Sequence, residues 1–252
     1  MKDVAVVTGG SSGIGAELAR SLVRAGWHCV LLARGAERLE ALAGELGAEY
    51  EVCDVGSRAD IERVAATVSA RHPRIGLLVN NAGIGARADF LTAPPERIED
   101  VTRTNYLGGV WALRAFLPAL ERAAPSHVVN VVSVAGVIAF PPSGPYTASK
   151  HAQLAFSRAT AAQLRRRGVR VHAVLPGFVE TPGFPQRGVL PPPLSWTVID
   201  VDRVARAILR AVRWNRREIY VPWWYRAVAL LQGIAPGVVA SVLGRGNYRP
   251  AA

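Results

Sequence analysis

Short, continuous apolar runs alternate with longer amphipathic segments along almost the whole chain. The apolar runs are expected to be strands, at Val4–Val7, Cys29–Leu32, Tyr50–Cys53, Leu77–Val79, Val128–Val132, Val169–Val174 and Glu218–Val221. The segments between them have helical periodicity, over Ile14–Arg24, Ala36–Leu46, Arg58–Ala70, Pro95–Leu120, Tyr146–Arg167 and Val201–Trp214. Apolar runs without alternation indicate strands buried on both faces, as in a parallel sheet covered by helices. The pattern therefore predicts an α/β fold, with a single doubly wound Rossmann-type domain built on a mostly parallel seven-stranded sheet.

The length and composition fit one domain of this kind. The chain has 252 residues, of which 50% are hydrophobic and 19% charged, so we expect a large buried core and no disordered chain. Its formal net charge of +11 has three interpretations: a solvated arginine-rich surface, an anionic small ligand or membrane surface, and nucleic acid. Nucleic acid comes last, because the arginines are scattered and no recognition motif accompanies them, and we expect no nucleic-acid partner.

Two questions can be addressed from the cysteines, the histidines and the N-terminus: the cellular compartment of the protein, and whether a metal site is expected. Cys29 and Cys53 lie in apolar stretches without metal-ligand or Cys-x-x-Cys spacing, which favours reduced core residues in a reducing compartment. His127 and His151 also lack metal or triad spacing, so no metal site is expected. The first strand follows Met1 closely and is too short and wrongly flanked for a signal peptide, so we expect a cytoplasmic protein.

A glycine-rich loop follows the first strand and opens the first helix. It comprises Gly9, Gly10, Ser11, Ser12, Gly13, Ile14 and Gly15. Glycines at such a turn let backbone N–H groups approach a pyrophosphate at the positive end of a helix. A glycine cluster alone could be a mere turn, but its place after the first strand of a doubly wound domain predicts nucleotide binding.

The end of the second strand bears on which nucleotide binds. A carboxylate there would bind the ribose 2′-hydroxyl of NAD and repel a 2′-phosphate. Ala33 occupies that position and Arg34 follows it, an arrangement suited to a phosphorylated ribose. Arg38 is either a helper or part of a solvated helix face. NADP(H) is therefore favoured over NAD(H).

Lys150 stands four residues after Tyr146 in a predicted helix, in a chain whose other cations are almost all arginine. Residues spaced by four share a helix face, so the ammonium and the phenol can enter one site. An adjacent positive charge lowers the pKa of a phenol and makes it usable as an acid or base. The pair alone is weak evidence, because a tyrosine at a helix start is often an ordinary aromatic residue.

Several motifs together resemble the short-chain dehydrogenase/reductase family over about residues 3–221. They are Thr8-Gly9-x-x-x-Gly13-Ile14-Gly15, Asn80-Asn81-Ala82-Gly83, Ser133 after the fifth strand, Tyr146-x-x-x-Lys150 and Pro176-Gly177-Phe178-Val179-Glu180-Thr181. The resemblance implies that Tyr146 is the general acid/base, with Lys150 as its electrostatic partner. It implies that Ser133 orients the substrate carbonyl and that Asn105 anchors a water of the proton relay. Taken singly, Ser133 could be a strand-end hydroxyl and Asn105 a buried polar group.

The resemblance also implies a set of cofactor contacts. These are Gly9, Ser11, Ser12, Gly13, Ile14, Gly15, Arg34, Asp54, Val55, Asn81, Ala82, Gly83, Tyr146, Lys150, Pro176, Gly177, Val179 and Thr181. Asp54 would contact the adenine, although it could equally be the N-cap of the next helix. The Val179 backbone and the Thr181 hydroxyl would hold the nicotinamide carboxamide.

The segment 182–199 is expected to be a lid over the site, within a catalytic domain formed by residues 1–222. It is rich in proline and glycine and carries Phe184, Leu190, Leu194 and Trp196. With Phe140 and Phe178 as further walls, Phe184 would line a site for a hydrophobic carbonyl or alcohol substrate. Alternatively, these side chains pack against the domain itself or a neighbouring subunit.

Residues 223–252 form an apolar C-terminal extension, expected to be helical. Gly233 and Pro236 divide it into two short helices, which are too interrupted for a transmembrane span. Trp223-Trp224-Tyr225-Arg226, an apolar stretch and a basic end with Arg245 and Arg249 are typical of a peripheral hairpin at a membrane surface. A contact within a homo-oligomer and a cover over the substrate mouth are the alternatives.

The leading hypothesis is an NADPH-dependent oxidoreductase that reduces a ketone or aldehyde on a hydrophobic molecule, such as a lipid, a steroid-like compound or a long-chain keto compound. We expect a homo-oligomer, either a dimer or a tetramer. One alternative is a small-molecule carbonyl reductase or alcohol dehydrogenase whose extension is a subunit contact. A second is a non-catalytic NADPH sensor, which would have no need of Tyr146 or Lys150.

Overall fold

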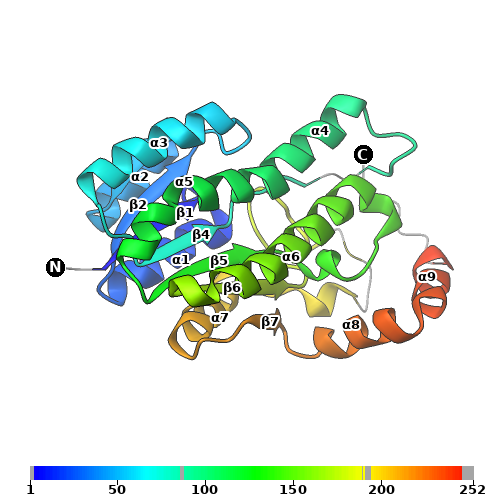
Figure 1. The fold of residues 1–252 in the computed structure, drawn as a ribbon. Coiled ribbons are helices and arrows are strands. Elements are labelled where there is room, and N and C mark those ends of the chain that lie inside the picture. Colours follow the sequence, from blue (N-terminus) through cyan, green and yellow to red (C-terminus); the bar gives the residue numbers. More distant parts are fainter. Residues whose placement is uncertain (1–2, 86–87, 189, 191–193, 246–252) are drawn as a thin grey trace.

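A single parallel sheet forms the centre of the molecule, with helices on both of its faces (Figure 1). The computed structural model describes residues 3–85, 88–188, 190 and 194–245. The strands are β1 (Val4–Thr8), β2 (His28–Ala33), β3 (Glu49–Val52), β4 (Leu77–Asn80), β5 (Ser126–Val131), β6 (Val169–Pro176) and β7 (Glu218–Val221). They follow the order β3-β2-β1-β4-β5-β6-β7, and every neighbouring pair is parallel. The expected seven-stranded Rossmann-type sheet is confirmed, with every strand end within two residues of its expected position.

Two helical layers explain why the strands are apolar on both faces. The helices of the domain are α1 (Gly13–Arg24), α2 (Ala36–Leu46), α3 (Arg58–Arg71), α4 (Pro95–Thr102), α5 (Gly108–Arg122), α6 (Gly144–Leu164) and α7 (Val201–Arg213). Buried residues of α1, α2 and α7 pack on one face of the sheet, against alternate strand residues such as Val7 and Leu31. Those of α3, α5 and α6 pack on the other, against Val6 and Leu32. The strand order reverses between β1 and β4, which is where such folds place their ligand sites.

The segment expected to be one helix over Pro95–Leu120 is interrupted. Between α4 and α5 the structure has a π-helical turn, Arg103–Leu107. π-turns insert an extra residue into an α-helix and are frequent at functional sites. Here the turn contains Asn105, whose side chain is directed to the loop after β4, as described below.

The C-terminal extension forms α8 (Tyr225–Ile234) and α9 (Pro236–Arg245), bent by 116° where the two helices meet. The expectation of two short helices is therefore confirmed. In the described part of the chain no single helix is long and apolar enough to cross a membrane; only α8 and α9 counted together are. In Figure 1 this pair lies at the end of the molecule opposite the N-terminus. Some predicted features lie outside the described residues: residues 191–193 of the expected lid, Arg249, and the side chains of Leu194 and Arg245.

Candidate active site

The glycine loop after β1 is packed so tightly that two of its positions require glycine. Gly9 has a φ of 65°, and a Cβ there would lie 2.9 Å from both the Ala82 Cα and the Asn81 Nδ2. A Cβ on Gly15 would lie 2.2 Å from the Gly9 carbonyl oxygen. The loop therefore presents bare backbone at the N-terminus of α1, as a phosphate cradle requires. Ser12 precedes α1 with its side chain exposed and without a capping hydrogen bond.

Thr8 fastens this loop to the turn after β4. Its Oγ1 donates to the Val79 carbonyl (3.1 Å) and accepts from the backbone N–H groups of Asn81 (3.0 Å) and Ala82 (3.1 Å). The Asn81 Nδ2 donates in turn to the carbonyls of Thr8 (3.0 Å) and Gly9 (3.2 Å). The predicted contact residues of the two loops thus form one hydrogen-bonded unit. Thr8 belongs to the glycine motif, but its role cannot be predicted from the sequence because it depends on pairing across the sheet.

The segment after β6 closes over the same loop. Its backbone is paired with Ile199, since the Ile199 N–H donates to the Phe178 carbonyl (2.9 Å) and the Glu180 N–H donates to the Ile199 carbonyl (2.9 Å). A Cβ added to Gly13 would lie 3.3 Å from the Thr181 Cγ2. The expected carboxamide-binding segment, Pro176–Thr181, therefore lies beside the glycine loop.

Asn105 joins the π-turn to the loop after β4 and to α6. It is fully buried, and its Oδ1 accepts from the Ile84 N–H (2.8 Å) while its Nδ2 donates to the Ile84 carbonyl (3.0 Å) and the Ser149 Oγ (3.0 Å). The Ser149 hydroxyl donates to the Tyr146 carbonyl (2.7 Å). Asn105 therefore fixes the first turn of α6 through Ser149, a residue that the sequence did not single out.

Lys150 is almost completely buried and is held by two uncharged acceptors. Its Nζ donates to the Val131 carbonyl (3.0 Å) and to the Gln153 Oε1 (2.9 Å), and it lies 5.7 Å from the centre of the Tyr146 ring. Gln153, one helical turn further along α6, is a second partner that the sequence analysis missed. Burial lowers the pKa of Lys150 to about 7. A Cβ on Gly83 would lie 3.7 Å from this Nζ, so the amine faces the turn after β4.

Tyr146 and Ser133 come together from α6 and from the end of β5. Burial raises the pKa of the Tyr146 hydroxyl, and hydrogen bonding with the Ser133 side chain opposes that rise. Ser133 Oγ also accepts from the Ala135 N–H (3.1 Å) and donates to the Pro176 carbonyl (3.4 Å). The phenol is protonated at neutral pH, so the group can donate a proton to an oxygen atom placed between the two hydroxyls.

One aromatic ring stacks on Tyr146, and others lie in neighbouring segments. The Phe184 ring stacks on the Tyr146 ring with centroids 6.2 Å apart, and Phe140 meets Phe178 edge to face at 6.3 Å. Phe90 adds a further ring, because a Cβ on Gly144 would lie 2.5 Å from its Cδ2. No pattern in the sequence indicates a role for Phe90, which lies in an irregular loop before α4.

The C-terminal extension packs on the apolar wall next to these rings. Tyr225 is buried, and its ring packs directly against Gly177. Val239 of α9 belongs to the same buried cluster as Ile138. In the lid, Leu190 is buried, whereas Trp196 is 83% exposed and forms no wall of the site.

The expected adenine and ribose contacts lie after β2 and β3. The Asp54 Oδ1 accepts from the Gly56 N–H (2.9 Å), while Ser57 is the N-cap of α3 and accepts from the Asp60 N–H (3.3 Å). The alternative in which Asp54 is the N-cap is therefore wrong. Val55 is buried. Arg34 is exposed and, within the residues described, has no hydrogen-bond or ion-pair partner.

A doubly wound parallel sheet with a bare glycine loop at its switch point, and a partly buried Ser133–Tyr146–Lys150 group beside that loop, defines a nucleotide-binding Rossmann enzyme. A family model described as short chain dehydrogenase matches residues 3–188. The chain belongs to the short-chain dehydrogenase family and is an oxidoreductase, which confirms the resemblance seen in its motifs.

Individual relatives cover most of the chain. Farnesol dehydrogenase of Aedes aegypti is 38% identical over 195 residues, which span 73% of this chain and 80% of that one. The 17-beta-hydroxysteroid dehydrogenase 13 of Rattus norvegicus is 31% identical over 248 residues, spanning 95% of this chain and 81% of that one. A short chain dehydrogenase of Burkholderia cenocepacia, solved in complex with NADP, is 29% identical with a TM-score of 0.83 and covers 96% of this chain and 97% of its own.

Proposed function

We propose that the chain is an NADPH-dependent reductase of ketones or aldehydes on hydrophobic molecules. The observation that carries this proposal is the Tyr146 phenol, a partly buried proton donor that interacts with Ser133 and lies beside the Lys150 amine and the Phe184 ring. Two relatives are named for hydrophobic alcohols, farnesol and a hydroxysteroid, which supports the substrate class.

The residues present fit a phosphorylated dinucleotide. The bare backbone of the glycine loop and the uncapped start of α1 suit the pyrophosphate. Arg34, exposed beside the buried Ala33, suits a ribose 2′-phosphate and not the hydroxyl of NAD. Structures of related chains that hold NADP support the same preference. Asp54 and Val55 would border the adenine, Asn81 to Gly83 and Lys150 the second ribose, and Pro176–Thr181 the nicotinamide.

Reduction needs a hydride on the carbonyl carbon and a proton on its oxygen. When bound, the reduced nicotinamide supplies the hydride. Tyr146 donates its phenolic proton to the oxygen, while the Ser133 hydroxyl donates a hydrogen bond to the same oxygen and so positions it. Lys150, protonated, stabilises the tyrosinate left behind. Asn105 and Ser149 act by holding the backbone at Tyr146.

The cofactor preference can be tested at Arg34. Replacing Arg34 with Ala is expected to raise the KM for NADPH by about 10-fold or more, because a charge-assisted hydrogen bond to the phosphate is lost. The KM for NADH should stay unchanged, since the ribose hydroxyl carries no charge. Arg38→Ala is the matched control, and steady-state kinetics with both nucleotides measure the effect. Equal losses for NADPH and NADH would contradict the assignment.

The substrate class can be tested with methyl ketones of increasing chain length. Each buried methylene contributes about 0.8 kcal/mol, so kcat/KM should rise by about fourfold per carbon until the apolar wall is filled. Phe184→Ala should flatten that rise, whereas Trp196→Ala, which removes an exposed ring of the same lid, should not. A kcat/KM that does not depend on chain length would favour the small-molecule carbonyl reductase instead.

We also propose that the outer face of α8 and α9 rests on an anionic membrane surface. This face exposes Leu230, Ile234, Val238 and Val242, and the indole of Trp223 is 79% exposed just before it. Arg226 is exposed at the start of α8, and the chain carries a net charge of +11. Apolar side chains with a flanking indole and cations are typical of interfacial helices. The cytoplasmic location expected from the sequence stays a prediction.

Vesicle flotation tests the membrane proposal. Ile234→Asp should lower the fraction bound to phosphatidylserine vesicles by about tenfold, because burying an isoleucine contributes about 1.5–3 kcal/mol. Leu91→Asp is the control, since Leu91 is 96% exposed but lies far along the chain from the extension. If a second copy of the chain covers this face, light scattering without vesicles will show a dimer that Ile234→Asp dissociates. Unchanged flotation would contradict the proposal.

A further inference from the structure

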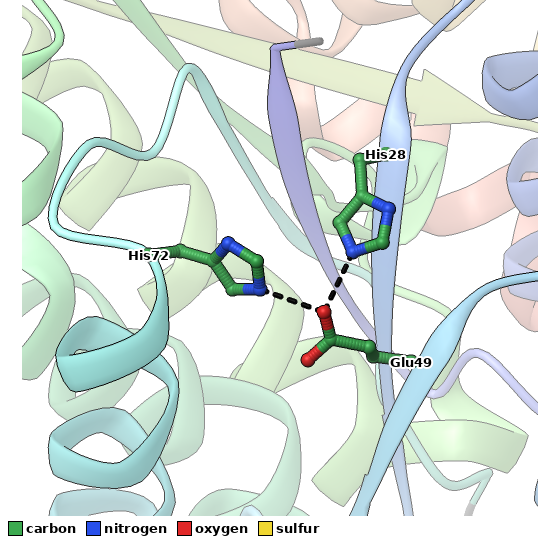
Figure 2. A group of neighbouring side chains, drawn as sticks. All are labelled: His28, Glu49 and His72. Carbon is green, nitrogen blue, oxygen red and sulfur yellow. Dashed lines mark hydrogen bonds and ion pairs between the residues drawn. The ribbon is translucent and has the colours of Figure 1, made fainter. Parts of the chain in front are cut away.

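Three potential metal ligands converge at the end of the sheet where β2 and β3 begin, away from the catalytic group. His28 is the first residue of β2, Glu49 is the first residue of β3, and His72 follows the last residue of α3 (Figure 2). The Nε2 atoms of His28 and His72 each lie 2.8 Å from the Oε1 of Glu49. All three ligand atoms lie within 4.8 Å of one another.

The backbone on each side of the cluster is fixed by the fold. Glu49 pairs with Val30 in the parallel ladder, two residues along the strand from His28 and on the same face. The His28 N–H donates to the Asp3 carbonyl (2.9 Å), and the His72 N–H donates to the Val68 carbonyl (2.8 Å). The three side chains are between 19% and 33% exposed, so the cluster is held by the protein and still reachable by an ion.

The two hydrogen bonds already direct the Nε2 atoms of His28 and His72 toward the same oxygen atom, the Glu49 Oε1. A carboxylate only accepts, so each imidazole must carry its hydrogen on Nε2 to bond with Oε1. A divalent cation in place of those two hydrogens would meet two imidazole nitrogens and one carboxylate oxygen. This His₂Glu set is used by protein zinc sites, with ligand bonds of about 2.0–2.2 Å. Tetrahedral geometry places ligand atoms about 3.3 Å apart, so the 2.8 Å contacts would open slightly.

The second oxygen of Glu49 has its own partner. The Arg71 Nε lies 3.1 Å from the Glu49 Oε2, and the Arg71 Nη2 lies 2.8 Å from the Glu51 Oε1. The Arg71 contact orients the Glu49 carboxylate, as the outer partners of metal ligands do. Glu51 offsets the repulsion that Arg71 would exert on a cation.

We propose that His28, Glu49 and His72 bind one divalent transition-metal ion, of which Zn²⁺ is the best match, with water completing the coordination. The ion would tie the end of α3 to the starts of β2 and β3. Its role is structural, because the cluster lies at the opposite end of the β3–α3 unit from Asp54 and Val55.

Titration of the full chain with Zn²⁺ tests the site. After treatment with a chelator, calorimetry should show one ion bound per chain, and zinc at a hundred times its Kd should raise the Tm by about 5 °C or more. Cobalt in place of zinc should give the visible absorption of a tetrahedral site. His72→Gln should abolish the binding, while His151→Gln, on an exposed histidine of α6, should leave it intact.

Two further measurements keep the proposal testable if one variant folds poorly. Glu49→Gln should weaken zinc binding as well, and circular dichroism without metal shows whether each variant is folded. No heat and no Tm change with zinc in the unaltered chain would overturn the proposal and leave a hydrogen-bonded ion-pair cluster. Equal zinc binding by folded His72→Gln would overturn it too.

Discussion

Replacing Tyr146 with Phe is expected to lower kcat for carbonyl reduction by about 1000-fold or more, because general acid catalysis contributes about 10²–10⁴. The Phe ring keeps the volume of the Tyr ring and its stacking on Phe184, and only the hydroxyl that interacts with Ser133 is lost. The Kd for NADPH, measured by fluorescence titration, should change by less than about threefold, since the hydroxyl is one of many expected cofactor contacts and acts mainly in the transition state.

Tyr220→Phe is the control for the Tyr146 variant. The Tyr220 phenol is partly buried and donates to Glu218 (2.8 Å) at the last strand, outside the site. The Tyr220→Phe variant should leave kcat unchanged. A Tyr146→Phe enzyme that keeps most of its kcat would show that the proton comes from elsewhere, with Ser133 or water as the source, and the assignment of Tyr146 would be wrong.

Replacing Gly15 with Ala should weaken NADPH binding by about 100-fold or more, the second large effect. The added Cβ would lie 2.2 Å from the Gly9 carbonyl oxygen and 2.6 Å from the Asn81 Nδ2. Both atoms are fixed by the network around Thr8, so the loop must distort to admit the methyl group, and the phosphate-facing backbone moves with it. Losing even two backbone hydrogen bonds to a charged phosphate costs about 3–6 kcal/mol.

Gly44→Ala is the matched control, because nothing lies within 4 Å of a Cβ at that position in α2. It should raise the free energy of unfolding by about 0.5–1 kcal/mol and leave the Kd for NADPH unchanged. Titration of both variants, with thermal unfolding to confirm that each is folded, makes the comparison. Wild-type affinity in Gly15→Ala would mean that the cofactor does not approach this loop.

The sheet could be predicted from the sequence because its inner strands are buried on both faces. β1 and β4 consist almost entirely of buried apolar residues, and β2 contains a similar run, a pattern typical of strands covered on both faces. The π-turn at Arg103–Leu107 could not be predicted, since a single extra residue scarcely disturbs the apolar spacing of a long helix. The turn accompanies the long-range bonding of Asn105 to Ile84, which the local sequence does not encode.

Part of the candidate site could likewise be predicted from the sequence, and part could not. Tyr146 and Lys150 could be paired from their spacing on one helix. Phe90 and Ser149 could not be found, because their roles depend on segments that meet only in the folded chain. The aromatic residues at the start of the extension show the same limit: Trp223 is exposed and Tyr225 is buried against Gly177, although both are apolar rings two positions apart.

The central claim is that the chain transfers hydride from NADPH to a hydrophobic carbonyl. The most direct test uses NADPH carrying deuterium in both positions at nicotinamide C4, with a long-chain methyl ketone as substrate, and mass spectrometry of the product. We predict one alcohol formed per NADPH consumed, with one deuterium on the carbinol carbon. Tight binding of NADPH without alcohol formation from any ketone or aldehyde of the series would contradict the claim and favour a non-catalytic sensor.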